Sequence, residues 1–215
     1  MILKVCGMRE PGNISAVEEL QAGYGMPRSA GWMGFIFWPK SSRYVAAPPA
    51  YLPQRVRRIG VFVDAPLTDV IQHVADYGLY GVQLHGHETP EYVQSLRAAV
   101  SVTVIKAFCI STSADLEATS LYSGLADYFL FDAKGPSAGG NGTQYDWSML
   151  NAYQGPVPFL LSGGIGPDDA QHISDFRHPY LAGIDLNSRF EHAPALKDIH
   201  LLTTFMKSLQ SLSLL

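Results

Sequence analysis

Two residues in this 215-residue sequence, Cys6 and Asp132, could act as the general base and the general acid of a proton-transfer reaction. Cys6 follows a short apolar run, and a thiol in a polar pocket can act as a base if a cation or backbone amides lower its pKa. Asp132 ends another apolar run, and a carboxyl group partly shielded from water can stay protonated and act as an acid. The plainer interpretations are a small buried thiol for Cys6 and a loop-anchoring carboxylate for Asp132.

A glycine-rich turn over residues 162–166 predicts a phosphate site. Gly163 and Gly164 would let the backbone approach an anion closely, and residues 167–169 are expected to open a helix whose N-terminus adds positive potential. A second segment, with Asp185, Asn187 and Ser188, follows a later apolar run and could complete the cradle, with Arg189 adding charge. The alternative for the first segment is a plain tight turn.

Other candidates are basic or imidazole side chains after apolar runs. The guanidinium of Arg43 suits a planar carboxylate, while Lys40 and Lys106 are each as consistent with a solvated surface. His85 is expected to orient a neighbour or contact the ligand. The pair His85 and His87 is a weak metal motif without a matching set of Asp, Glu or Cys ligands, so we predict no metal.

These candidates share one position, because each follows a run typical of a buried strand. Eight such runs end at residues 5, 37, 63, 84, 105, 131, 161 and 184, and helical spacing appears at 13–22, 67–77, 91–100 and 199–209. Strand and helix alternating in this way predict an α/β fold, a single-domain (β/α)8 TIM barrel over residues 1–215. A doubly wound open sheet is the alternative, but eight units in this length favour closure. All loops after the strands of a barrel open on one face, which would gather the candidates there.

Composition narrows the class of protein further. The net charge of -4 argues against general nucleic-acid binding, and the basic cluster at 55–58 is expected to solvate a helix end or loop. The sequence begins without a secretion signal and contains no run near the roughly 18 apolar residues of a membrane helix, so a cytoplasmic protein without a membrane partner is expected. Its two cysteines fit a reducing compartment, since a disulfide would need their Cα atoms within about 7 Å.

The ordered set of motifs resembles phosphoribosylanthranilate isomerase. The resemblance runs from the first strand to the last, and seven motifs in register make it specific; they lie at 4–9, 34–45, 60–64, 82–86, 131–147, 161–165 and 183–188. It implies a barrel without cofactor or metal, acting in tryptophan biosynthesis. The reaction would be the Amadori rearrangement of N-(5-phosphoribosyl)anthranilate to 1-(o-carboxyphenylamino)-1-deoxyribulose 5-phosphate.

The resemblance also implies roles for residues. Cys6 would be the general base, Asp132 the general acid and Arg43 the partner of the anthranilate carboxylate, while segments 162–166 and 186–188 would hold the phosphate. The partner is then a small phosphosugar, and the protein is a monomer or a homodimer because relatives include both.

The sequence departs from this family at two places. Residues 187–191 replace the frequent Ser-Ser-Gly-Val-Glu, so that Arg189 stands for glycine, and residues 142–144 lack the usual lysine. Competing hypotheses are the histidine-pathway Amadori isomerase, indole-glycerol-phosphate synthase and a non-catalytic phosphosugar-binding protein. The first would have aspartate in place of Cys6, the second needs catalytic lysine and glutamates in a pattern not seen here, and the third would lack the Cys6–Asp132 pair.

Overall fold

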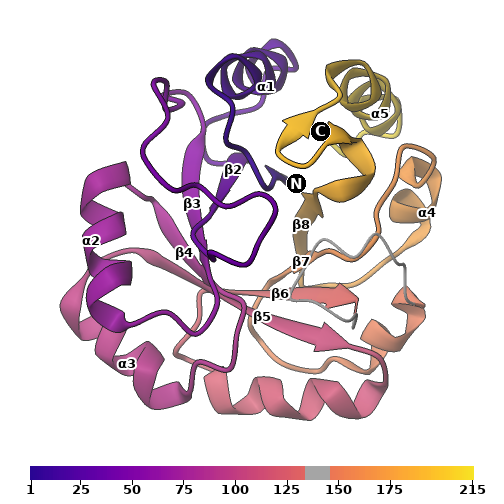
Figure 1. Cartoon of the computed structure of the whole chain (residues 1–215). Helices are drawn as coiled ribbons and strands as arrows, with labels where there is room; N and C mark the ends of the chain where they lie inside the picture. The colour runs from indigo at the N-terminus through magenta and orange to yellow at the C-terminus, as the bar shows by residue number, and fades with distance from the viewer. Residues whose placement is uncertain (134–145) are drawn as a thin grey trace.

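The computed structural model describes residues 1–133 and 146–215 and contains a closed parallel barrel of eight strands, as predicted. Figure 1 shows the strands as a central ring with helices around it. Strand β1 pairs with both β2 and β8, which closes the ring. The strands are β1 (Ile2–Val5), β2 (Gly31–Ile36), β3 (Arg57–Phe62), β4 (Gly81–Leu84), β5 (Thr103–Ile110), β6 (Tyr128–Ala133), β7 (Phe159–Leu161) and β8 (Leu181–Leu186).

The four helices predicted from periodicity are all present, with ends within two residues of the expected positions. They are α1 (Pro11–Gly23), α2 (Leu67–Tyr77), α3 (Pro90–Ala99) and α5 (Ile199–Ser211). Proline begins α1 and α3, where its missing N–H costs nothing, and the Thr89 side chain accepts from the backbone of Tyr92 to cap α3. Gly78, in the left-handed region, ends α2.

The remaining crossovers depart from a regular alternation of strand and α-helix. A 3-10 helix η1 (Ser113–Tyr122) follows β5, a second, η2 (Trp147–Ala152), precedes β7, and α4 (Ala170–Asp175) is short. After β8 come η3 (Ser188–Phe190) and a two-stranded ribbon of β9 (Glu191–Ala193) and β10 (Leu196–Lys197). The expected helix opening at Pro167 is wrong, since residues 167–169 form a turn and α4 begins at Ala170.

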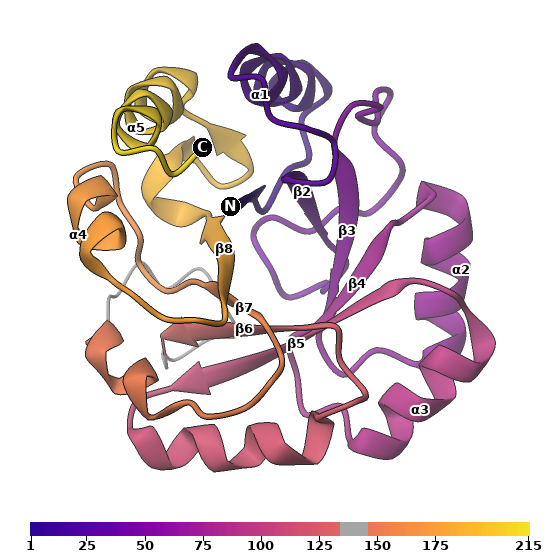
Figure 2. The ribbon, with the colours of Figure 1, turned by 180° about the vertical axis from the view of Figure 1, so that it is seen from behind.

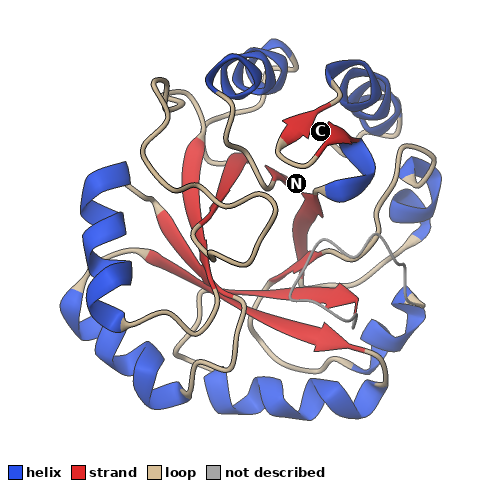
Figure 3. Ribbon diagram, in the orientation of Figure 1, coloured by secondary structure: helices blue, strands red, loops and turns tan. Residues whose placement is uncertain are grey.

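The crossover from β2 to β3 carries no helix in residues 37–56, all of which the structure describes. Figure 3 shows it as a long loop. The carboxylate of Glu18 on α1, which is buried, holds this segment by accepting from the Tyr51 hydroxyl and from the backbone N–H groups of Gln54 (2.6 Å) and Arg55. The buried carboxylate of Glu18 thus holds this segment in the place that a crossover helix would otherwise occupy.

The core has two parts because side chains alternate along each strand. One face of each strand packs against the surrounding helices. The other face points into the barrel, where an apolar group fills the lower part: Trp32, Ile59, Ile105, Ala107, Leu130 and Leu160. Two residues further along β6 and β7 the inward positions become polar. Leu130 is followed by Asp132 and Leu160 by Ser162, so the lower part of the barrel is apolar and its C-terminal mouth carries polar side chains.

The two ends of the chain meet. The N-terminal ammonium of Met1 donates to the carbonyl of Leu214 at 3.2 Å, and Figures 1 and 2 show both termini beside the start of β1. Helices α1 and α5 lie next to each other at this place. Within the described residues no helix has the length and apolar character that crossing a membrane requires.

Candidate active site

Six of the nine predicted site residues line one pocket at the C-terminal mouth of the barrel: Cys6, Arg43, His85, Asp132, Asp185 and Asn187. Apolar walls from Ile36, Val61 and Val63 and the indole of Trp38 complete it. A larger hollow of about 550 Å³ lies between η1 and η2, but none of the predicted site residues lines it. The mouth of the barrel is therefore the candidate active site.

Cys6 is held at the inner wall of this pocket. Its backbone N–H donates to Leu186 at 2.8 Å, which ties the end of β1 to β8. Its sulfur fills the space over Gly34, where a Cβ would lie only 2.6 Å from Sγ, so a larger residue at 34 would displace the thiol. Cys6 and Cys109 are both free thiols in the structure, Cys6 buried and Cys109 exposed.

Lys4, two residues before Cys6 on the same face of β1, is the cation beside the thiol. It is fully buried, its Nζ lies 2.8 Å from Oδ1 of Asp185, and it also hydrogen-bonds Cys6. Burial raises the pKa of the Cys6 thiol, and Lys4 opposes that rise without cancelling it. The expectation that a cation stands nearby is correct, but a lowered thiol pKa is not found, because desolvation outweighs the cation.

Asp132 sits across the mouth from β1 and is also buried. Its Oδ1 accepts from the backbone N–H of Ala133 at 2.9 Å and lies 3.4 Å from the hydroxyl of Ser162, which in turn lies 3.5 Å from Asp185. The segment expected to shield Asp132, residues 134–145, lies outside the described residues. Ser162 therefore bridges the two carboxylates.

His85 faces Asp132, with Nε2 3.4 Å from Oδ2. Burial alone would lower the imidazole pKa, but the neighbouring Asp132 and Cys109 favour the charged ring and raise the pKa to about 9. The amide of Gln83 lies 2.8 Å from Nδ1, and its other end, Oε1, has no hydrogen-bond partner among the described residues. Rotating that amide by half a turn would let Oε1 accept from a protonated ring, so Gln83 can serve both charge states of His85.

Arg43 is fixed by a bidentate ion pair that sequence analysis did not assign. Its Nε lies 3.0 Å from both carboxylate oxygens of Glu191, and Nη2 lies 2.7 Å from Oε2. Lys197 meets the same carboxylate at 2.5 Å and Asn187 Oδ1 at 2.8 Å. Burial would raise the pKa of Glu191, but these two cations hold it below its usual value. Gly7, at φ 76°, leaves the room that Arg43 and Asn187 occupy.

The glycine-rich turn lies above β7. Gly163 and Gly164 both have positive φ, at 91° and 71°, a conformation that turns successive backbone amides towards one side. The guanidinium of Arg189 packs over Gly166, because a Cβ there would lie 2.8 Å from Nε. Gly166 N–H is already bonded to Asp169 at 2.6 Å, and Ser188 begins η3. The positive charge that the described residues place beside this turn is the Arg189 guanidinium over Gly166.

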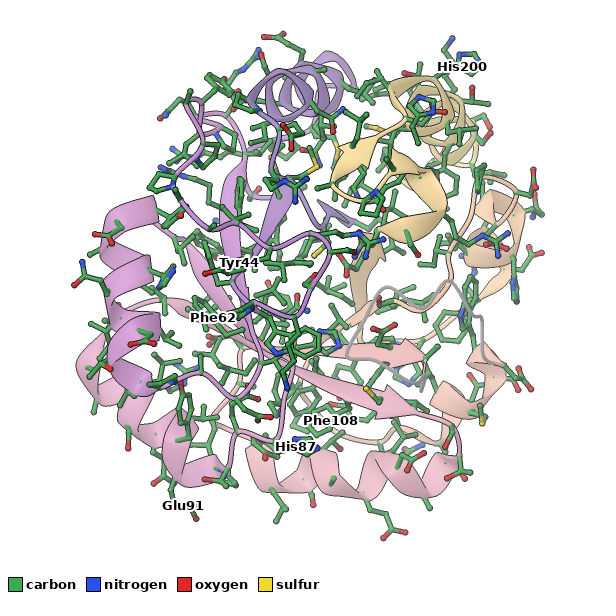
Figure 4. The ribbon with its side chains drawn as sticks, in the orientation of Figure 1. Tyr44, Phe62, His87, Glu91, Phe108 and His200 are labelled. Carbon is green, nitrogen blue, oxygen red and sulfur yellow. The ribbon has the colours of Figure 1, made fainter. Side chains whose placement is uncertain are left out.

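The weaker candidates lie apart from the pocket. His87, labelled in Figure 4, points to solvent with Nδ1 3.2 Å from Asp64, so it diverges from His85. Lys106 is buried against Glu88 at 3.1 Å, and Lys40 is exposed. No group of three or more His, Cys, Asp or Glu side chains in the described part of the chain is arranged to hold a metal ion.

Comparison with known proteins assigns a family to this geometry. Residues 4–208 match the family model described as N-(5'-phosphoribosyl)anthranilate (PRA) isomerase. The chain is 49% identical over 210 residues to the N-(5'-phosphoribosyl)anthranilate isomerase of Phocaeicola vulgatus, with 98% of both chains covered. The structure resembles the phosphoribosyl anthranilate isomerase of Thermus thermophilus (TM-score 0.82, 29% identity, 99% and 100% coverage). It also resembles a phosphoribosyl anthranilate isomerase solved with reduced 1-(o-carboxyphenylamino)-1-deoxyribulose 5-phosphate (TM-score 0.76, 26% identity, 98% and 100% coverage).

Proposed function

Because this chain belongs to the N-(5'-phosphoribosyl)anthranilate isomerase family, we propose that Cys6 is the general base and Asp132 the general acid of its reaction. That reaction, in tryptophan biosynthesis, is the Amadori rearrangement of N-(5'-phosphoribosyl)anthranilate to 1-(o-carboxyphenylamino)-1-deoxyribulose 5-phosphate. The observation that carries the assignment is that both groups line one pocket, Cys6 beside the cation of Lys4 and Asp132 beside His85.

The chemistry needs one proton donor and one proton acceptor. Protonated Asp132 gives its proton to the ring oxygen as the C1'–O bond breaks, and the anthranilate nitrogen lone pair forms the C=N bond of a Schiff base. The Cys6 thiolate then removes the C2' proton, which yields an enolamine. Asp132 then takes up the C2' hydroxyl proton and the Cys6 thiol protonates C1', which gives the ketone and returns both groups to their starting protonation states. Each group is worth roughly 10²–10⁴-fold in rate.

Lys4 enters this scheme as a positioning residue. A buried thiol whose pKa is raised is a poor source of thiolate. The adjacent ammonium of Lys4 favours the charged form most, and Lys197 adds a smaller effect in the same direction. Asp185 holds that ammonium in place at 2.8 Å. We expect the reactive thiolate to form beside this Lys4–Asp185 pair.

Two clamps are expected to fix the substrate between acid and base. Arg43, held by Glu191, would meet the anthranilate carboxylate with the face of its guanidinium that points into the pocket. Amides of Gly163, Gly164, Asn187 and Ser188 would cradle the phosphate, with the Arg189 guanidinium packed over Gly166 as a further contact. His85 would lie between the clamps, beside Asp132. Arg189, which stands where the family usually has glycine, would thus add a positive charge to the phosphate site.

The competing enzymes fit the site less well. A histidine-pathway isomerase would pair two aspartates as acid and base, whereas the residue at the end of β1 here is Cys6. A binding protein would not need a thiol, an ammonium and two carboxylates held together in a buried pocket. We further infer a cytoplasmic enzyme that forms one domain over residues 1–215 and acts as a monomer or homodimer on a small phosphosugar. Light scattering of the purified protein distinguishes the two oligomeric states.

The fluorescence of phosphoribosylanthranilate tests the proposal. The substrate is formed in situ from anthranilate and phosphoribosyl pyrophosphate with a separate transferase, and its decay is followed after adding the protein. Cys6→Ala and Asp132→Asn are expected to lose at least about 100-fold in kcat while ligand binding changes little. The matched control is Asp168→Asn, which alters an exposed aspartate outside the pocket. Near-normal turnover in either site variant removes the role assigned to that residue.

A further inference from the structure

A cluster of three arginines lines a cavity on the barrel face opposite the active site. The cavity measures about 260 Å³ and is lined by Arg28, Ser29, Arg57, Arg58, Gly78 and Tyr80. These residues precede or begin β2, β3 and β4, so they lie where the strands enter the barrel. That face of a barrel usually serves stability, which makes a concentration of like charges there unexpected.

None of these three guanidinium groups has a carboxylate partner. Every ion pair in the described part of the chain involves other residues. Residues 134–145 contain no Asp or Glu in the sequence, so they supply no hidden partner. By contrast Arg9, Arg43, Arg55 and Arg97 each meet a carboxylate elsewhere. A ligand from outside the chain would therefore have to neutralise the positive charge of the three arginines.

Neutral groups nevertheless hold two of the arginines in place. Arg57 stacks on the ring of Tyr80, with Cζ 3.8 Å from the centroid, and donates to its hydroxyl at 2.6 Å. Arg58 donates to the carbonyl of Tyr77 at 2.7 Å. Burial and the nearby charge of Arg28 lower the pKa of Arg58, although Glu18 offsets part of this effect. The guanidinium groups are therefore ordered in advance while repelling one another, and a bound anion would relieve that repulsion.

We propose that this cavity binds a small polyvalent oxyanion with a phosphoryl group, such as phosphate or pyrophosphate. Guanidinium forks match phosphoryl oxygens in geometry as well as charge. The volume is just below the roughly 300–1,000 Å³ of pockets for drug-sized ligands, so the ligand is small. The site is separate from the phosphate cradle of the active site, which lies at the other end of the barrel.

Calorimetric titration with pyrophosphate tests this site at fixed ionic strength. Arg28→Ala is the first variant, because Arg28 is exposed and its loss should not disturb folding. Arg177→Ala is the matched control, since Arg177 is also exposed and lies in the loop that leads into β8 on the same end of the barrel. We expect one binding event to weaken at least about tenfold in Arg28→Ala and to be unchanged in Arg177→Ala. Identical isotherms for parent and Arg28→Ala overturn the proposal.

Two further measurements separate this site from the catalytic pocket and from other anions. The kcat and KM of Arg28→Ala for phosphoribosylanthranilate should equal those of the parent, and a raised KM would mean that the weakened event belongs to the active site. Arg28→Glu should abolish the event that Arg28→Ala weakens. A short single-stranded oligonucleotide provides the remaining comparison: tighter binding to it than to pyrophosphate, lost in Arg28→Ala, would make the cluster a nucleic-acid surface and refute the small-anion site.

Discussion

Lys4→Met tests whether the buried ammonium sustains the thiolate of Cys6. Lys4 is fully buried, hydrogen-bonds Cys6 and lies 2.8 Å from Asp185. A unit charge about 4 Å away is worth roughly 4 kcal/mol at an effective dielectric constant near 20, which is about three pKa units. Asp185 is expected to take up a proton once Lys4 is gone, which removes its repulsion of the thiolate. We therefore expect the pKa of the Cys6 thiol to rise further in Lys4→Met.

The alkylation rate of Cys6 by iodoacetamide reports this change. Each unit by which a thiol pKa rises lowers the thiolate fraction about tenfold, but a more basic thiolate is also more nucleophilic, with a Brønsted coefficient of about 0.4–0.5. The two effects leave a rate more than about twofold slower at every pH well below the pKa. The measurement is made in a Cys109→Ser background, because Cys109 is exposed and would react as well.

Controls separate this electrostatic effect from damage to the fold. Lys207→Met removes an exposed lysine on α5 and should leave the rate unchanged. Lys4→Met leaves Asp185 buried without its partner, so the double variant Lys4→Met/Asp185→Asn is included to recover folding while still lacking the ammonium. A folded Lys4→Met protein whose Cys6 reacts within twofold of the parent rate would refute the reasoning.

Three further changes follow from the described contacts. Arg189→Gly removes the guanidinium over Gly166. In steady-state kinetics at low salt, KM should rise roughly five- to tenfold with kcat unchanged. An unchanged KM would exclude Arg189 from the phosphate site. Glu191→Gln frees Arg43 and leaves Lys197 buried without its carboxylate partner. KM should therefore rise, and urea unfolding should show a free energy of unfolding lower by about 3 kcal/mol. An effect on kcat alone would contradict a clamp role. The pKa of His85 is raised to about 9, so the stability that its protonation contributes is complete below pH 6.5 and is lost as the pH rises through about 9. The free energy of unfolding should fall by up to roughly 3 kcal/mol across that window. His85→Gln should make this fall smaller.

The fold and the positions of Cys6 and Asp132 at the barrel mouth were predictable from the sequence because both depend on local patterns. Short apolar runs specify parallel strands, and the residue that ends such a run must lie at the mouth of a barrel. Cys6 and Asp132 stand at such ends, and the structure places both in one pocket. Lys4 was missed because a lysine in a strand is usually exposed. Its spacing of two from Cys6, which puts both on one face of β1, was the available sign.

Features that depend on distant partners were not predictable in this way. Glu191 and Arg43 are 148 residues apart, so their bidentate pair depends on the folded barrel rather than on either segment. The crossover at 37–56 lacks a helix, and its prolines at 48, 49 and 53 argued against one, but no local pattern pointed to Glu18 as its anchor. The direction of the Cys6 pKa likewise depends on how much water the closed barrel excludes.

Pairing between the first and the last strand of the barrel has a consequence for how activity appears during synthesis. The thiol of Cys6 directly follows β1, whereas the carboxylate that holds its neighbouring ammonium belongs to β8, so some 180 residues must be made before the two meet. Until then β1 has an unpaired edge on that side, and contacts of such long sequence separation form slowly. A ribosome-bound chain that ends before β8 should therefore have strands and helices but no working base. Assembly of the catalytic site and closure of the barrel are then one kinetic event.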